Sequence, residues 1–435
     1  MILTKVNSIL KKVLPATIKK IIRKSYFAYQ LKQVQNNHRK ALINLRGKEK
    51  IKATFFLINE STWKYDYLYK LMEIDQRFEP IIVICPFIKY GDENLTRTMS
   101  IAFNHFKEKG YTTINTLNNE TGEWLDVKNV LNPDIVFFTS PYNLTRPEYQ
   151  ITNFLDTLSC YVPYGFKNSY LYEALYDQLT HNFVWKFFLE TTVHQEFSKK
   201  YARNKGINTV VTGYPGMDTF FNRDYTPNDV WKIKDRKIKR IIWAPHHTIP
   251  GYGFSLNYST FLKYCDVMFE IAEKFKDRIQ LAFKPHPILR QNLNKPEVWG
   301  KHRTDKYFKK WEDLENGQLN ESEYLDLFIT SDAMIHDCGS FTVEYLYTSK
   351  PVMFIVGDDN ITDRYNELGK IAFTKLYHGK NQEEIESFIE ETVLKNKDPK
   401  KEERDKFFKE IITPPNNQTA SQNILDIIKA EIFYQ

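Results

Sequence analysis

The chain has 435 residues, of which 42% are hydrophobic and 26% are charged. This ordinary globular composition excludes a collagen, a coiled coil and a wholly disordered protein, and the length predicts two or three domains. The four cysteines stand more than 70 residues apart, which excludes a small disulfide-stapled module and argues against a zinc site. No signal peptide or long apolar stretch is visible, so we expect a cytoplasmic protein without a membrane span.

The positive charge is concentrated at the N-terminus. The net charge is +7, yet residues 1–52 hold 14 Lys and Arg residues against one acidic residue, Glu49, and the rest of the chain carries −6. Apolar residues from Ile2 to Ile22 recur at steps of three and four, which predicts a helix with lysines on its other face and a break near Pro15. A basic amphipathic helix suits an anionic membrane surface, so we expect residues 1–45 to dock peripherally on the inner face of the cell membrane.

The arm has alternative uses. It could instead pack on its own protein with a solvated basic face. Nucleic acid is not an expected partner, because the arm lacks sustained interleaving of basic and aromatic residues and the remaining chain is acidic.

After the arm, short apolar runs alternate with longer amphipathic segments, which is typical of a parallel sheet built from βαβ units. The predicted strands are 53–58, 80–84, 134–138, 160–162 and 209–213 in the first half, and 240–244, 280–283, 333–335 and 351–356 in the second. Predicted helices of the second half lie around 258–275, 341–348, 380–396, 399–412 and 419–434. A polar stretch with proline and aspartate interrupts the pattern between the two halves.

This pattern predicts an α/β protein of two doubly wound, Rossmann-like domains that face a cleft, preceded by the basic helical arm. The expected parts are the arm at 1–50, an N-terminal domain at 51–222, a linker at 223–237, a C-terminal domain at 238–415, and a helix at 416–435 that could pack back on the first domain.

One predicted loop carries an anion-binding pattern. Asp337, Gly339 and Ser340 follow a buried strand and precede a helix. Free N–H groups and the helix dipole at such a turn attract phosphate, with Ser340 as the expected N-cap. Glu344 lies one turn later and could accept hydrogen bonds from sugar hydroxyls. The alternative is an ordinary α/β turn that binds nothing.

Two further loops carry histidines directly after predicted strands. Prolines flank His286 in the sequence Lys284-Pro285-His286-Pro287 and restrict the loop, so a cation and an imidazole could neutralise a phosphate there. His246 and His247 are adjacent, and adjacent histidines point apart unless the loop curls. We therefore favour phosphate or acceptor contacts over a metal ion. Because all three loops leave strand carboxyl ends, we expect them to converge on the cleft.

Several ordered motifs resemble the CDP-glycerol glycerophosphotransferase family, whose members build teichoic acids and related capsular polymers. They are Thr212 to Asp218, Ala244-Pro245, Lys284 to Pro287, and the block from Ser331 to Pro351, which together cover about residues 200–370. The resemblance implies a GT-B-type fold with the nucleotide bound mainly by the C-terminal domain, the acceptor bound by the N-terminal domain, and peripheral membrane attachment. It places His286 on the family's donor-phosphate histidine and Gly339 and Ser340 on its Ser-Ser pair, and Glu344 falls where the family usually has Asp.

The candidate general base lies in the N-terminal half. The family has a catalytic histidine there in a Trp-His-Gly-Thr motif, and the nearest counterpart here, Tyr161 to Gly165, has none. Tyr164 could take that position. Alternatively Glu60, just after the first strand, could deprotonate the acceptor hydroxyl, although a first-turn helix acid is an equally ordinary role for it.

The sequence thus predicts a transferase that moves a polyol phosphate from a CDP-activated donor to a lipid-linked or polymer acceptor in cell-surface polymer synthesis. The alternative on the same fold is a glycosyltransferase that uses a nucleotide sugar for a capsular or surface polysaccharide. A less favoured alternative is a non-catalytic, membrane-docked assembly subunit. No pattern requires a metal ion or another cofactor, since the activated nucleotide is a substrate.

Overall fold

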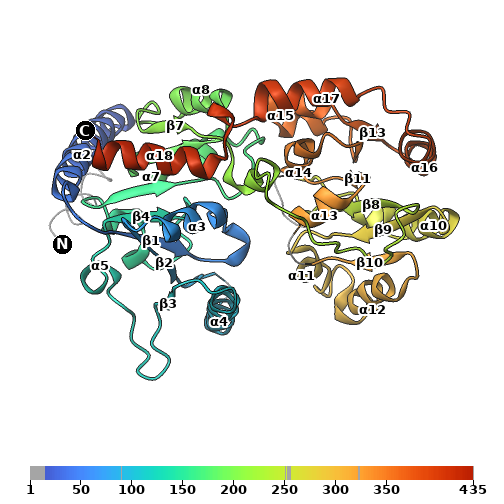
Figure 1. The fold of residues 1–435 in the computed structure, drawn as a ribbon, viewed down its shortest axis with the longest axis horizontal. Coiled ribbons are helices and arrows are strands. Elements are labelled where there is room, and N and C mark those ends of the chain that lie inside the picture. The colour runs from blue at the N-terminus through green and yellow to red at the C-terminus, as the bar shows by residue number, and fades with distance from the viewer. Residues whose placement is uncertain (1–14, 90, 250, 252–255, 322–323, 435) are drawn as a thin grey trace. The chain divides into compact units, whose positions relative to one another are not determined.

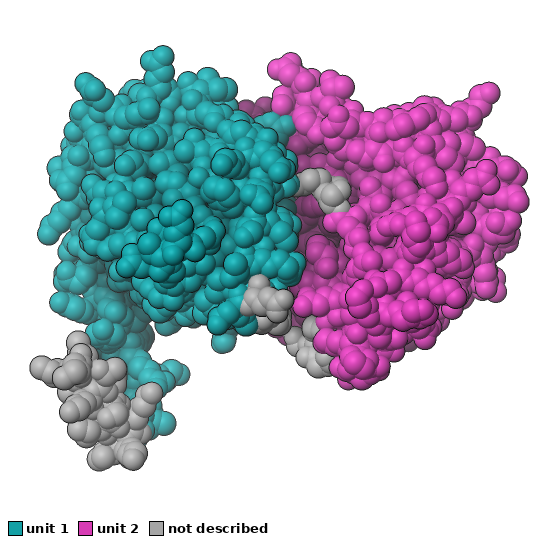
Figure 2. Space-filling model, turned by 90° about the horizontal axis from the view of Figure 1, so that it is seen from below, with its two compact units in different colours: residues 1–164, 172–215, 420–435 teal, residues 165–171, 216–419 magenta. Residues whose placement is uncertain are grey.

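The computed structural model describes residues 15–89, 91–249, 251, 256–321 and 324–434. These residues form two compact units (Figure 2). Unit 1 comprises residues 1–164, 172–215 and 420–435, and unit 2 comprises residues 165–171 and 216–419. The chain therefore crosses between the units four times. Residues 223–237, expected to form the linker, belong to unit 2.

Unit 1 is built on a seven-stranded sheet in the order β3-β2-β1-β4-β5-β6-β7, with every pair of neighbours parallel (Figure 1). Both faces of the inner strand β1 are buried, because Phe55 and Leu57 point into one apolar cluster and Phe56 into another. Such two-sided burial explains the continuous apolar runs in the sequence. The strands are β1 (Ile51–Leu57), β2 (Phe78–Ile84), β3 (Thr113–Asn115), β4 (Ile135–Phe138), β5 (Leu158–Tyr161), β6 (Lys186–Leu189) and β7 (Thr209–Val211).

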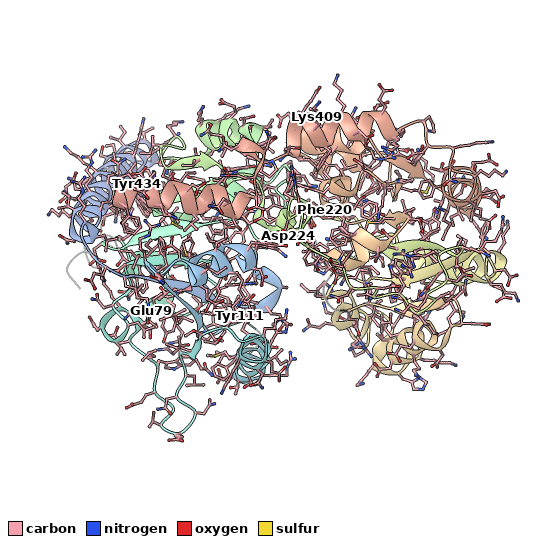
Figure 3. The ribbon with its side chains drawn as sticks, viewed as in Figure 1. Glu79, Tyr111, Phe220, Asp224, Lys409 and Tyr434 are labelled. Carbon is pink, nitrogen blue, oxygen red and sulfur yellow. The ribbon has the colours of Figure 1, made fainter. Side chains whose placement is uncertain are left out.

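Helices cover this sheet, and one of them comes from the far end of the chain. Ile424, Ile428 and Ile432 of α18 lie in the same apolar cluster as β1, so the red C-terminal helix in Figure 1 lies among the elements of unit 1. Tyr434 follows it directly (Figure 3). The helices of unit 1 are α2 (Ala16–Leu45), α3 (Asp66–Ile74), α4 (Asp92–Glu108), α5 (Val127–Val130), α6 (Tyr172–Tyr176), α7 (Leu179–Phe183), α8 (Thr192–Tyr201) and α18 (Ala420–Phe433).

Helix α2 contains the described part of the basic arm and begins after Pro15, where the sequence predicts a break. Its second half packs on unit 1, because Val34, His38 and Leu45 are buried there. The first half exposes apolar side chains, including Ile21 and Tyr29 at 64% and 61%. The arm is therefore divided between a packed half and an exposed half, and its residues 1–14 lie outside the described part of the chain. Among the described residues, no helix combines the length and the apolar character needed to cross a bilayer.

Unit 2 is built on a six-stranded sheet in the order β10-β9-β8-β11-β12-β13, again parallel throughout. Its strands are β8 (Lys239–Ala244), β9 (Ile279–Phe283), β10 (Gly317–Leu319), β11 (Ala333–His336), β12 (Val352–Ile355) and β13 (Tyr377–Gly379). Its α-helices are α9 (Phe261–Tyr264), α10 (Val267–Lys274), α11 (Leu289–Leu293), α12 (Gly300–Asp313), α13 (Leu325–Thr330), α14 (Phe341–Glu344), α15 (Glu367–Thr374), α16 (Gln382–Ser387) and α17 (Lys401–Phe407).

The segment that opens unit 2 is anchored along its length. Figure 3 marks Phe220 and Asp224 near its start, and the ring of Phe221 stacks on Phe408 at 5.8 Å. Further on, Trp231 is buried, and its indole N–H donates to Thr330 Oγ1 at 2.8 Å. A polar sequence with proline indicated a free linker at 223–237, but this buried tryptophan fixes the stretch to unit 2.

Candidate functional site

The candidate site lies at the carboxyl ends of three neighbouring strands of unit 2. Strands β9, β8 and β11 are consecutive in the sheet, and the loops that follow them carry Lys284 and His286, then His246 and His247, then Asp337 to Ser340. The loops after β8 and β9 are joined by two backbone bonds, from Lys284 N to Trp243 O at 2.8 Å and from His286 N to Pro245 O at 3.2 Å. Parallel pairing thus brings together the three loops that sequence spacing singled out.

Three histidines meet at this edge. The ring centroids of His246 and His247 are 4.2 Å apart, and those of His247 and His286 are 4.1 Å apart. Ring nitrogens of all three lie within 4.8 Å of one another. We expected adjacent histidines to point apart unless the loop curls. The loop does curl, because Thr248 N–H donates back to His246 Nδ1 at 3.3 Å and Thr248 Oγ1 lies 2.9 Å from the same nitrogen.

The backbone fixes the protonation pattern of two of these rings. Nδ1 of His246 accepts the N–H of Thr248, and Nδ1 of His286 accepts the N–H of Ile288 at 3.2 Å. A neutral imidazole that accepts at Nδ1 carries its proton on Nε2. Metal-binding histidines usually show the opposite arrangement, in which the second nitrogen donates its proton outward. The two rings are therefore set to donate hydrogen bonds, which suits an anion better than a metal ion.

Desolvation keeps these rings neutral. Burial lowers the pKa of His246 and of His286 well below the usual 6.5, with the neighbouring histidines as a further cause. It also lowers the pKa of His247 to about 4. The trio therefore contributes N–H donors rather than positive charge. Lys284 is the cation of the same loop, and its side chain is 5% exposed.

Asp337 organises the loops rather than facing solvent. Its carboxylate accepts the backbone N–H groups of His246 and Thr260, and also the Thr260 hydroxyl at 2.8 Å. Burial raises the pKa of Asp337 to about 7, although these donors pull it down. The sequence interpretation placed Asp337 among the donor-binding residues. In the structure its carboxylate is buried beneath these loops, where it joins the loop after β11 to His246 and Thr260.

The turn at Gly339 and Ser340 differs in one respect from the prediction. Ser340 takes the N-cap position of α14, as expected, but it has helical dihedral angles and its side chain makes no capping hydrogen bond. The residue lies inside a continuous turn rather than at its extended start, where a capping side chain would reach back. Its backbone N–H still lies at the start of α14. The ring of Tyr258 covers the turn, 3.3 Å from where a Cβ on Gly339 would stand.

Glu344 is occupied by the protein itself. The side chain is buried, and its carboxylate accepts the N–H of Phe166 at 3.2 Å and the hydroxyl of Tyr324 at 2.9 Å. The predicted contact with sugar hydroxyls would have to displace these partners. In this structure Glu344 anchors residues 165–171.

The two candidate bases belong to unit 1. Glu60 opens a short 3₁₀ helix (Glu60–Thr62) just after β1, and its side chain is exposed. Asn59 caps this turn by accepting the N–H of Ser61 at 2.9 Å. Tyr164 is 39% exposed, and its hydroxyl is hydrogen-bonded to Tyr142. Desolvation of the hydroxyl outweighs the opposing effect of this hydrogen bond and raises the pKa of Tyr164, so this phenol keeps its proton at neutral pH.

Sequence reasoning missed four residues that shape the site. Thr260 binds Asp337, Tyr258 covers Gly339, Tyr324 binds Glu344, and the amide of Asn168 donates to Gly339 O. None of them follows a strand in a recognisable motif. Each is brought in from an intervening loop, so local spacing carried no signal for it.

Solved structures share this fold. The wall teichoic acid polymerase TagF superposes with a TM-score of 0.58 at 12% identity, covering 95% of this chain and 97% of that one. A UDP-N-acetylglucosamine 2-epimerase gives 0.57 at 15% identity, with 89% and 97% covered. The complex of Staphylococcus aureus MnaA with UDP gives 0.53 at 16% identity, with 88% and 98% covered. The two Rossmann-like sheets therefore have the GT-B-type fold, as predicted.

The family assignment comes from the sequence. The family model described as CDP-glycerol:poly(glycerophosphate) glycerophosphotransferase matches residues 180–430, which is more than half of the chain. No match is found among curated proteins. The chain belongs to this glycerophosphotransferase family and is a transferase, which confirms the resemblance drawn from its motifs.

Proposed function

We propose that this protein transfers a polyol phosphate, glycerol phosphate or a close analogue, from a CDP-activated donor to a lipid-linked acceptor during synthesis of a teichoic-acid-like surface polymer. Membership of the family supports this proposal. The observation that carries it is the trio His246, His247 and His286 beside Lys284, which offers hydrogen-bond donors and one cation at a single sheet edge.

The donor diphosphate fits this edge. The Nε2–H groups of His246 and His286 and the ammonium of Lys284 would face phosphate oxygens, together with the backbone N–H of Ser340. The acceptor hydroxyl attacks the phosphorus that carries the polyol, a new P–O bond forms, and the bond to CMP breaks. Negative charge then grows on the CMP phosphate, where these donors stabilise it. A bound diphosphate would also raise the histidine pKa values, because opposite charge favours the protonated ring.

The acceptor hydroxyl must lose its proton, and we propose Glu60 as the base. A carboxylate is a usual general base in enzymes, whereas the phenol of Tyr164 already carries its proton. Tyr164 instead donates or accepts a hydrogen bond to the acceptor. Glu60→Gln should lower kcat by about 10²-fold or more, the usual range for a lost general base, and Tyr164→Phe should act mainly on the KM for the acceptor. The reverse pattern would assign the base to Tyr164.

The test of the donor assignment is a calorimetric titration of the purified protein with CDP-glycerol, CDP-ribitol, UDP-sugars and free nucleotides. His286→Ala is compared with His302→Ala, a matched control because His302 is an exposed histidine of α12 in the same unit. Binding of a CDP-polyol that is lost only in His286→Ala supports the proposal. Preference for a UDP- or GDP-sugar would replace it by the nucleotide-sugar glycosyltransferase.

We also propose that the exposed half of α2 docks on an anionic membrane. Its apolar side chains Ile18, Ile21, Ile22, Tyr26 and Tyr29 are exposed beside Lys19, Lys20, Arg23 and Lys24. Each basic residue near an anionic surface contributes roughly 1 kcal/mol of attraction. A variant with these four basic residues changed to Gln should lose sedimentation with phosphatidylglycerol vesicles. Four Lys→Gln changes on the exposed face of α12 form the control, and equal binding by the α2 variant would refute docking.

A further inference from the structure

Residues 165–171, hereafter the strap, are a short piece of the N-terminal half that belongs to unit 2. The chain enters the strap from Tyr164 and leaves it at Tyr172, both of which belong to unit 1. The strap is not a loose connection, because Phe166, Lys167 and Asn168 are 3–4% exposed.

The strap is held on two sides. On one side it meets α14 and the turn before it, through the bonds from Phe166 N to Glu344 and from Asn168 Nδ2 to Gly339 O. On the other side it meets the start of α15. The bonds there run from Asn366 N to Asn168 O at 2.8 Å, from Asn366 Nδ2 to Lys167 O at 2.9 Å and from Tyr170 N to Arg364 O at 3.2 Å.

A glycine permits this close approach. A Cβ on Gly369 would lie 2.5 Å from the carbonyl oxygen of Asn168 and 2.8 Å from the Tyr365 ring. A contact of 2.5 Å with backbone is far inside van der Waals distance, so any larger residue at this position must push the strap away. Substitutions at Gly369 and at Asn168 therefore disturb the packing of the strap on unit 2 in two independent ways.

The position of Asn168 has a direct consequence for the candidate donor site. A peptide unit is planar and trans, so the carbonyl of Gly339 and the N–H of Ser340 point in opposite directions. The amide of Asn168 holds the carbonyl, which also accepts the N–H of Thr342 at 3.2 Å. Fixing the oxygen on one side of the peptide fixes the direction of the Ser340 N–H on the other.

We propose that Asn168 is a positioning residue of the donor site, which sets the orientation of the Gly339–Ser340 peptide toward the donor phosphate. This inference rests on the proposed function, because it assumes that the turn binds a phosphate. Asn168 itself touches no reacting atom. The strap makes the donor site depend on a segment that lies about 170 residues earlier in the chain.

The test compares wild type with Asn168→Ala and Gly369→Ala. Both should raise the KM for CDP-glycerol, and the dissociation constant of CDP, about tenfold, the effect of losing one hydrogen bond to a charged group. The KM for the acceptor should stay unchanged, whereas a general structural defect would change the kinetics of both substrates. Tyr170→Phe is the control, because the strap bond of this residue uses its backbone N–H and its side chain is 40% exposed.

The outcomes separate this inference from the proposed function. If wild type binds CDP-glycerol and both variants bind it equally well, the positioning role is refuted and the function stands. If wild type binds no CDP-polyol, the proposed function fails and this inference fails with it. If the variants weaken acceptor and donor kinetics alike, or melt at lower temperature, the strap is structural only and the positioning role is refuted.

Discussion

A buried histidine in α2 should make the packing of this helix sensitive to mild acid. His38 is 6% exposed, and its Nε2 has no hydrogen-bond partner among the described residues. Desolvation lowers its pKa from 6.5 to about 4, because a protonated ring would have to leave water for an apolar contact. The folded state therefore holds the neutral ring.

The size of the effect follows from linkage. A group whose folded pKa is depressed contributes its full stability above the unfolded pKa, near 6.5, and loses it as the pH falls toward the folded value near 4. The full difference between the two pKa values corresponds to about 3 kcal/mol. Between pH 8 and pH 5 the wild type should lose about 2 kcal/mol through this residue.

The assay is urea unfolding at pH 8 and pH 5, with hydrogen exchange of the α2 amides to separate local from global opening. His38→Leu removes the titration and should lose about 2 kcal/mol less than wild type over this interval. His302→Gln, on an exposed helix surface of unit 2, should behave as wild type. Equal losses in wild type and His38→Leu would refute the reasoning.

Three further predictions concern buried residues inside one unit or the other. Trp231→Ala should destabilise unit 2 by about 3–5 kcal/mol in urea unfolding, since it empties a buried site and removes the indole N–H that Thr330 Oγ1 accepts. A change under 1 kcal/mol would mean that Trp231 does not hold residues 223–237 to unit 2. Ile428→Ala, in the fully buried face of α18, should cost unit 1 about 2–5 kcal/mol and leave unit 2 unchanged, as followed by hydrogen exchange; equal loss in both units would contradict the assignment of α18. Burial raises the pKa of Asp337 to about 7, so folding favours its protonated form. The free energy of unfolding should therefore fall as the pH rises from 4 to 7. In thermal melts, Asp337→Asn should lack this part of the pH dependence.

The central strands could be predicted from the sequence because they are buried on both faces. Strands such as β1 and β8 end in uninterrupted apolar runs, Phe55 to Leu57 and Ile241 to Ala244. The strands that the sequence did not reveal are short, and several lie at sheet edges. β3 has the sequence Thr-Ile-Asn and β13 has Tyr-His-Gly, so their pairing comes from the neighbouring strand rather than from their own pattern.

The candidate site could be predicted in part. The three loops were found because each follows a strong strand, and parallel pairing then places them at one edge. The curl that brings the rings of His246 and His247 together depends on the bond from Thr248 N–H to His246 Nδ1. Residue spacing in the sequence does not predict this bond. One partner of Glu344 is a backbone N–H 178 residues away, and a single sequence contains no sign of such a pair.

The four chain crossings bear on how the protein is made. Synthesis runs from the N-terminus, so the sheet of unit 1 emerges from the ribosome long before residues 420–433 that complete its core. Unit 2 contains no residue after Thr419. It includes residues 165–171, which are synthesised before any of its strands. A nascent chain therefore exposes the apolar surface that α18 covers on unit 1 until residues 420–433 have been synthesised, and a chain truncated after Thr419 would leave that surface uncovered.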